Sequence, residues 1–449
     1  MLSSKRWYSI PGLFSMASSI SKWSSFIDAK LNLVVETFNF KIVETRQRKM
    51  SQQQRTTTSF NFRSEHIAAS SSANNNNNKS ATNDSSDASA GTSNNKSTFM
   101  KSSLHHGDQR RTSSSNHHHS FHSSSSNSNH YRKKLSNSDV QEYLSSIAST
   151  CPIVDIGINL TNHQFKDSQE TISQVLKRCQ LVQVKCVILT GTSLRNSLES
   201  LSLISKFENH ESGVKLKCTV GIHPHDAKSF KNISELEQVI TSPQHNSSIC
   251  MVGECGLDYN RMFSPKQVQI HCFKEQLRMA IRLQKPIFCH ERDAHSDFVE
   301  CVQSVMKEFG NSTSLPPLVV HCFTGTRNEA KKYIDMGFYI GLTGCVCMEE
   351  RGKELREILR DGIIPRDKLL IETDSPFMLP PLSGNGHSVW KYVTGGRRNE
   401  PCLLPHVVNT IAECWNMTEN KQALEKQLTE NTARFLMMAD VKELIGSNH

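Results

Sequence analysis

The stretch CPIVDIGINL, from Cys151 to Leu160, has the pattern of a β-strand that is buried on both faces. It holds four β-branched Ile and Val residues and ends on Gly157 and Asn159, neither of which is a strong metal ligand. β-Branched side chains favour strands, and a nearly continuous apolar run is typical of strands inside parallel sheets. We therefore expect this stretch to be the first strand of a parallel sheet.

Seven further apolar runs follow, separated by stretches with the periodicity of amphipathic helices. The eight candidate strands span residues 152–160, 185–192, 215–224, 249–258, 286–292, 317–325, 338–347 and 369–376. Two of the intervening stretches begin with capping-box sequences, Ser264-Pro265-Lys266-Gln267 and Thr326-Arg327-Asn328-Glu329. Eight strands that each precede a helix predict an α/β fold of the (β/α)8 TIM barrel type.

The first part of the chain has a composition that argues against a folded core. It is rich in Ser, Asn, His, Thr and Gln, and it includes the run Asn74–Asn78 and the triplet His117–His119. Such a segment has too little apolar surface to offset the entropy lost on ordering. We predict a disordered extension over residues 1–149 and a single globular domain over residues 150–445.

The net positive charge lies entirely in this extension. Residues 1–150 carry 18 Lys and Arg against 9 Asp and Glu, whereas the rest of the chain carries 34 of each. A basic arm could attract nucleic acid in a salt-dependent way. We favour the alternative, a solvated extension without a task of its own.

The first residues are rich in Ser, contain Lys5, Arg6 and Lys22, and have no acidic residue before Asp28. This composition is that of a mitochondrial transit peptide, but a plain disordered start explains it equally simply. We expect a cytoplasmic or nuclear protein, with mitochondrial import as the alternative. No stretch approaches the apolar length of a transmembrane helix, so we expect no membrane partner.

The cysteines point to a reducing environment. All 14 lie at or after Cys151, mostly within apolar runs, and no CxxC pair or zinc-ribbon spacing occurs. This usage is typical of buried thiols in an intracellular protein and not of a disulfide framework.

Four polar residues share one position relative to the predicted strands. Glu254, His290, His321 and Asp374 each come where an apolar run ends. All strands of a parallel barrel end on the same rim, so these four side chains should converge. Two imidazoles and two carboxylates around one point predict a site for a divalent metal, which can acidify a bound water and neutralise anionic charge.

Each of these residues alone has an ordinary structural explanation. A single His at a strand end is more often a hydrogen-bonded core residue, Glu254 could be a salt-bridge partner, and Asp374 could cap a turn before Ser375-Pro376. Four such residues at equivalent strand ends favour the metal site over these separate explanations.

Further polar groups are predicted for the same rim. His223 and His225 close the third strand, Arg292 follows His290, and Arg397 and Arg398 lie beyond the eighth strand. Guanidinium groups suit phosphate oxygens, whereas a solvated loop or ion pairs with rim carboxylates is the alternative for the last two arginines.

Several segments resemble one known family. PIFCHERDAH, VVHCFTGT, YIGLTGCVC, LLIETDSPFMLP and RRNEPCLLPHV are similar to segments of the TatD family of metal-dependent deoxyribonucleases, and VGIHPHDA and GECGLDYNR agree. The resemblance covers roughly residues 152–439, in the same order and at barrel spacing. It implies a TIM barrel of the metal-dependent hydrolase type, a divalent cation and phosphodiester hydrolysis.

The resemblance also assigns residues. It places the family's metal ligands on Glu254, His290, His321 and Asp374, with Asp374 orienting or deprotonating a water. Many relatives carry a His-x-His pair on the first strand, where this chain has Gly157-Ile158-Asn159. TatD proper and its eukaryotic deoxyribonuclease relatives also lack the histidine pair, so the resemblance places this chain in their branch. Without that pair only Asn159 remains as a weak carbonyl ligand, which favours Mg²⁺ or Mn²⁺ over Zn²⁺.

We therefore expect a deoxyribonuclease that hydrolyses single-stranded or frayed DNA from the 3′ end, a preference implied by the resemblance. RNA is the alternative polymer. The sequence shows no series of aromatic residues for reading bases, so we expect little sequence preference. Two other functions stay open: hydrolysis of an ester or amide, such as that of a D-aminoacyl-tRNA, and non-catalytic binding of nucleic acid. The sequence says nothing of the oligomeric state.

Overall fold

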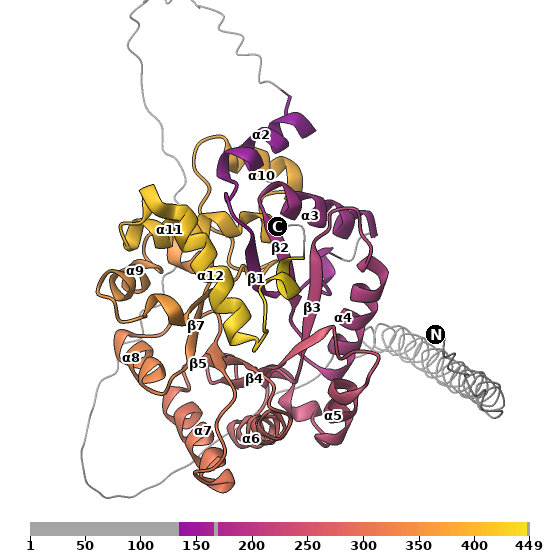
Figure 1. The fold of residues 1–449 in the computed structure, drawn as a ribbon, viewed down its shortest axis with the longest axis vertical. Coiled ribbons are helices and arrows are strands. Elements are labelled where there is room, and N and C mark those ends of the chain that lie inside the picture. The colour runs from indigo at the N-terminus through magenta and orange to yellow at the C-terminus, as the bar shows by residue number, and fades with distance from the viewer. Residues whose placement is uncertain (1–133, 166–168, 447–449) are drawn as a thin grey trace, which may run out of the picture. The chain divides into compact units, whose positions relative to one another are not determined.

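The computed structural model describes residues 134–165 and 169–446, and their fold is an eight-stranded parallel barrel surrounded by helices (Figure 1). Each strand pairs in parallel with the next one along the chain, in the order β1 to β8. The strands are β1 (Ile153–Ile158), β2 (Val184–Leu189), β3 (Lys215–Val220), β4 (Ile249–Asp258), β5 (Ile287–Arg292), β6 (Leu318–Val320), β7 (Tyr339–Leu342) and β8 (Leu369–Ile371). The predicted TIM barrel is confirmed.

The barrel closes between its first and last strands. Ile158 forms a parallel bridge with Ser375, which lies just beyond β8. The N–H of Asn159 donates to the carbonyl of Ser375 at 2.7 Å, and the N–H of Asp374 donates to the carbonyl of Gly157 at 2.9 Å. This closure brings the end of β1 beside the segment that carries Asp374.

Helices follow the strands and ring the barrel in Figure 1. They are α3 (Gln169–Leu181), α4 (Leu194–Phe207), α5 (Ser234–Thr241), α6 (Lys266–Leu283), α7 (His295–Phe309), α8 (Arg327–Asp335), α9 (Lys353–Arg360), α10 (Gly386–Thr394), α11 (Leu404–Cys414), α12 (Lys421–Phe435) and α13 (Lys442–Ile445). Within the described ranges, no helix is long and apolar enough to cross a bilayer.

The core has two parts. The larger one lies between the strands and the surrounding helices. The smaller one fills the barrel interior with residues such as Ile156, Met251 and Phe288, and it continues into Phe435 and Leu444 from α12 and α13. The C-terminal helices therefore help to bury the barrel interior.

Two predictions about local structure need correction. The domain begins before residue 150, because Asn137–Ile147 forms helix α2, which buries Tyr143 and Leu144 and contacts α10. Ser264 does not cap α6, since its hydroxyl donates to the carbonyl of His225 instead. The capping box at Thr326 and Glu329 is present as predicted. The extension over residues 1–133, with its proposed targeting segment, lies outside the described residues.

Candidate active site

One cavity of about 590 Å³ lies at the ends of the barrel strands. Eight of the ten residues that the sequence singled out line it, namely Asn159, His223, His225, Glu254, His290, Arg292, His321 and Asp374. They lie within β4 and β5 or in the segments that directly follow β1, β3, β6 and β8, so the barrel itself brings them together.

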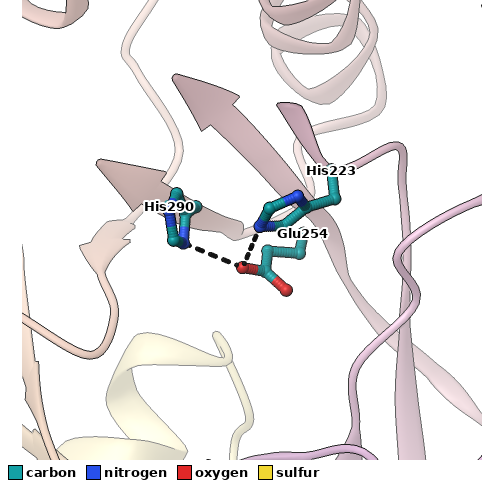
Figure 2. A group of neighbouring side chains, drawn as sticks. All are labelled: His223, Glu254 and His290. Carbon is teal, nitrogen blue, oxygen red and sulfur yellow. Dashed lines mark ion pairs between the residues drawn. The ribbon is translucent and has the colours of Figure 1, made fainter. Parts of the chain in front are cut away.

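The carboxylate of Glu254 lies at the centre of this group. Its Oε1 is 2.8 Å from Nε2 of His321, 3.2 Å from Nε2 of His223 and 3.2 Å from Nδ1 of His290. Figure 2 shows His223 and His290 converging on the same carboxylate oxygen. The structure thus adds His223, expected as a phosphate contact, to the donors nearest Glu254.

Close packing of two strands sets the distance between Glu254 and His290. Gly256 on β4 pairs with His290 on β5, and a Cβ at Gly256 would overlap the carbonyl group of His290. Gly256 also has φ +135°, a conformation that favours glycine. A larger residue would push β5, and with it His290, away from Glu254.

Asp258 holds two of the histidines from behind. Its Oδ2 is 2.8 Å from Nε2 of His225 and 3.3 Å from Nε2 of His290. Gln269 on α6 donates its side-chain amide to the carbonyl of Asp258, and its side-chain carbonyl accepts the Asp258 N–H. Asp258 was not predicted, although its place at the end of β4 could have indicated it.

Glu372 plays the corresponding part for His321. One carboxylate oxygen lies 3.3 Å from Nδ1 of His321, and the other accepts the backbone N–H of Cys322. The side chain is fully buried in the barrel. Glu372 was also missed by sequence analysis, because it precedes the strand-end position that drew attention to Asp374.

Gly157 explains what the first strand contributes. A Cβ at this position would overlap the carboxylate of Glu372 and lie 2.8 Å from the ring of Phe288. The first strand therefore leaves space for the Glu372 carboxylate at a position where, by the family resemblance, many relatives carry a histidine. Asn159, two residues on, donates its side-chain amide to Oδ1 of Asp374 at 2.9 Å. It thus contacts the expected metal ligand Asp374 in this structure.

The carboxylates and imidazoles of this group shift one another's pKa values. Burial alone would raise the pKa of Glu254, but His223 and His321 reverse this and hold it well below the usual value. Burial disfavours the charged form of His321, yet the carboxylates of Glu254 and Glu372 raise its pKa well above the usual value. His290 is likewise raised, against burial, by Asp258 and Glu254.

His223 and Asp374 behave differently. Burial outweighs the attraction of Glu254 and lowers the pKa of His223, which favours its neutral form. Burial raises the pKa of Asp374 to about 7, and the charge of His321 opposes the shift. Asp374 is therefore poised between its neutral and charged forms near neutral pH.

These residues fit a divalent cation. Among the described residues, ligand atoms of His223, Glu254 and His290 lie within 4.8 Å of one another. His321 and Asp374 line the same cavity. A cation would supply positive charge beside Glu254 in place of protons on the neighbouring histidines. The donor set of carboxylates and imidazoles suits several first-row and hard divalent ions.

The predicted arginines separate into two groups. Arg292 lines the cavity, whereas Arg397 is exposed and Arg398 is half-buried, and neither belongs to the lining. Arg398 donates to Glu400 at 2.7 Å and to the carbonyl of Gln164 at 2.8 Å. These contacts agree with the ion-pair alternative for Arg398, whose guanidinium ties the loop after α10 to buried Glu400, and its contact with phosphate stays a prediction.

Comparison with known proteins places these features in context. A family model described as TatD related DNase matches residues 154–437. A curated protein named 3'-5' ssDNA/RNA exonuclease TatD, from Cronobacter sakazakii, is 38% identical over 284 residues, which are 63% of this chain and 97% of the relative. The protein of the same name from Citrobacter koseri is 42% identical over 260 residues, covering 58% of this chain and 89% of the relative.

Solved structures show the same fold. A hydrolase of the TatD family from Entamoeba histolytica has 25% sequence identity and a TM-score of 0.54, covering 64% of this chain and 99% of that one. An uncharacterized amidohydrolase from Saccharomyces cerevisiae has 23% identity and a TM-score of 0.52, covering 63% and 99% respectively, and supports the fold alone.

Proposed function

The chain belongs to the family of TatD-related DNases, hydrolases that act on ester bonds, and on that premise we propose that it is a metal-dependent 3′–5′ exonuclease. The proposed substrate is single-stranded DNA, with RNA as a second polymer, because the curated relatives are named ssDNA/RNA exonucleases. The observation that carries the proposal is the Glu254 carboxylate set among three imidazoles in an open cavity.

We assign the metal-holding role to Glu254, His290, His321 and Asp374. A divalent cation bound there would neutralise phosphate charge and acidify an attacking water. Mg²⁺ is the proposed ion, with Mn²⁺ and Zn²⁺ as alternatives, since the first strand offers Asn159 and no imidazole. The contact of Asn159 with Asp374 supports a role for Asn159 in orienting that carboxylate.

The remaining residues bind phosphate and move protons. Asp374 accepts the proton of the attacking water at its carboxylate, a role suited to a group whose pKa lies near the working pH. His225, fixed by Asp258, and Arg292 lie along the cavity wall and contact non-bridging phosphate oxygens. Nδ1 of His223 accepts the backbone N–H of His225, so the one N–H of a neutral His223, on Nε2, faces Glu254 and would reach phosphate only where Glu254 releases it.

A direct test compares wild type, Glu254→Ala and the control Glu419→Ala, which alters an exposed carboxylate outside the cavity lining. Each protein is incubated with a 5′-labelled single-stranded DNA and RNA in Mg²⁺, Mn²⁺, Zn²⁺ or EDTA. We expect stepwise shortening from the 3′ end in wild type and Glu419→Ala, with metal only. Intact oligonucleotides with wild type in every metal would refute the proposed substrate and direct attention to ester or amide substrates.

Metal binding gives a readout that does not depend on turnover. Thermal unfolding of wild type should shift to higher temperature with added Mg²⁺ or Mn²⁺, since a ligand that binds only the native state stabilises it. The shift should be much smaller for Glu254→Ala. An equal shift in both proteins would place the ion elsewhere.

A further inference from the structure

Two exposed phenylalanine rings line the mouth of the catalytic cavity. Phe263 is 56% exposed and Phe377 is 48% exposed, although both belong to the cavity lining. Large aromatic side chains left this open to water at a binding site usually serve to contact a ligand. Phe263 follows β4 and Phe377 follows β8, strands four places apart in a closed ring of eight, so the rings come from opposite sides of the barrel mouth.

Both phenylalanines lie beside a residue of the proposed catalytic group. The ring of Phe263 lies edge-on to that of His225, with 4.8 Å between centroids. Phe377 lies in the turn that carries Asp374, and its N–H donates to the Asp374 carbonyl at 3.0 Å. A ligand that contacts both rings would therefore span the Glu254 cluster.

A second hollow of about 310 Å³ continues from the cavity. The two share four lining residues, Glu291, Arg292, Thr324 and Arg351, so one leads into the other. Within the described part of the chain, the guanidinium groups of Arg292 and Arg351 form no hydrogen bond or ion pair with another residue. Two such cations along a continuous groove suit a backbone of regularly spaced phosphates.

We propose that Phe263 and Phe377 form a base-stacking site that holds two bases of a single strand on either side of the phosphate to be cleaved, while Arg292 and Arg351 contact the phosphates of the strand as it leaves through the second hollow. The proposal rests on the proposed function and names how its substrate is held. Stacking on a phenyl ring requires an unpaired base and tolerates every base, which accounts for a preference for single strands without sequence specificity. Sequence analysis missed this pair because the two residues lie in separate loops.

The test pairs ring deletions with base deletions. Phe263→Ala and Phe377→Ala are compared with Tyr392→Ala, which removes an aromatic ring 50% exposed on α10 and outside the cavity lining. Substrates are a short single-stranded DNA and matched DNAs with one abasic residue at the last or the penultimate position. Each ring deletion should lower kcat/KM about 5- to 100-fold on intact DNA, the range expected from loss of one stacked base.

The decisive result is non-additivity. A ring deletion should cause little further loss on the DNA that lacks the partner base of that ring, because the contact is already gone. Phe→Trp at either position should restore most of the activity, whereas Phe→Leu should not. The stacking site would be overturned if the losses in kcat/KM from ring deletion and base deletion added in full on every substrate. It would also be overturned if kcat/KM of the ring-deletion variants stayed within about twofold of that of Tyr392→Ala.

The arginine part has its own measurement. Arg351→Ala should weaken binding of a hexanucleotide but not of a dinucleotide, and it should reduce the slope of log affinity against log salt by about 0.7, as expected for one phosphate contact on a single strand. An equal effect on both lengths would overturn the proposed exit path.

A binding readout separates failure of this inference from failure of the proposed function. Oligonucleotides that carry 2-aminopurine at the last or penultimate position are added to wild type in EDTA, where stacking should quench their fluorescence. Quenching that depends on the rings, in a protein that cleaves no nucleic acid, would leave the stacking site standing and refute the exonuclease. Cleavage that does not change when either ring is deleted would support the exonuclease and refute the stacking site. If neither ring-dependent quenching nor cleavage were seen, both proposals would be refuted.

Discussion

The carboxylate of Glu372 lies where a side chain at Gly157 would have to be. From this place Glu372 contacts Nδ1 of His321, whose Nε2 contacts Glu254. The first strand therefore takes part in the site by leaving room, not by offering a ligand. This relationship gives a physical reason for the absence of a histidine pair on that strand, and it can be tested from both sides.

Adding a side chain at Gly157 should damage the site. Gly157→Ala places a Cβ against Glu372 and Phe288 in a packed barrel, so we expect a loss of about 1–3 kcal/mol in the free energy of unfolding. Gly157→His should be worse and should not create a tight zinc site. Denaturant unfolding and competition with a zinc chelator measure the two effects. A stable Gly157→His protein with increased zinc affinity would contradict this account.

Removing the charge of Glu372 while keeping its side-chain volume should weaken metal binding. Glu372→Gln keeps the volume and can still accept the Cys322 N–H, but it no longer stabilises the charge and orientation of His321. We expect a loss of about 10- to 100-fold in metal affinity, typical for residues that orient a metal-binding histidine. The pKa of His321, followed by NMR, should fall in the same variant. Unchanged values for both would show that Glu372 only fills space.

The sequence predicted the barrel and most of the candidate site for the same reason. Apolar runs with Glu254, His290, His321 or Asp374 at their ends are local patterns, and the parallel barrel fixes where such ends meet. Eight of the ten selected residues accordingly line one cavity. The role of each residue stays a prediction, because a shared cavity shows that the side chains are close together but not what each one does.

What sequence analysis missed depends on contacts between distant segments. Asp258 and Glu372 act through His225, His290 and His321, and although the strand-end position of Asp258 is visible in the sequence, these partners are not. For Arg398 the sequence left phosphate contact and ion pairing both open, because it does not show that buried Glu400 lies within reach.

Metal affinity should depend on pH around neutrality. Metal ligands must lose their protons, and in the metal-free protein the pKa of Asp374 is about 7 while those of His290 and His321 are raised. Lowering the pH below 7 therefore adds protons that compete with the cation, and affinity should fall by up to about tenfold per pH unit for each proton displaced. Calorimetry in buffers of different ionisation enthalpy should show proton release on binding. An affinity that is constant from pH 6 to pH 8 would contradict this linkage.

Arg292 and Arg398 should give opposite results, although sequence analysis assigned them one role. Arg398→Ala leaves buried Glu400 with Arg178 as its remaining ion-pair partner, so the free energy of unfolding should fall, by about 1–3 kcal/mol. Catalytic constants of the folded variant should be near those of wild type. Arg292→Ala removes a half-buried cation from the cavity wall, so KM should rise and its salt dependence should weaken while stability stays within about 0.5 kcal/mol. Measuring unfolding and kinetics on both variants separates the two roles. A rise in KM for Arg398→Ala at unchanged stability would restore that arginine to the substrate path.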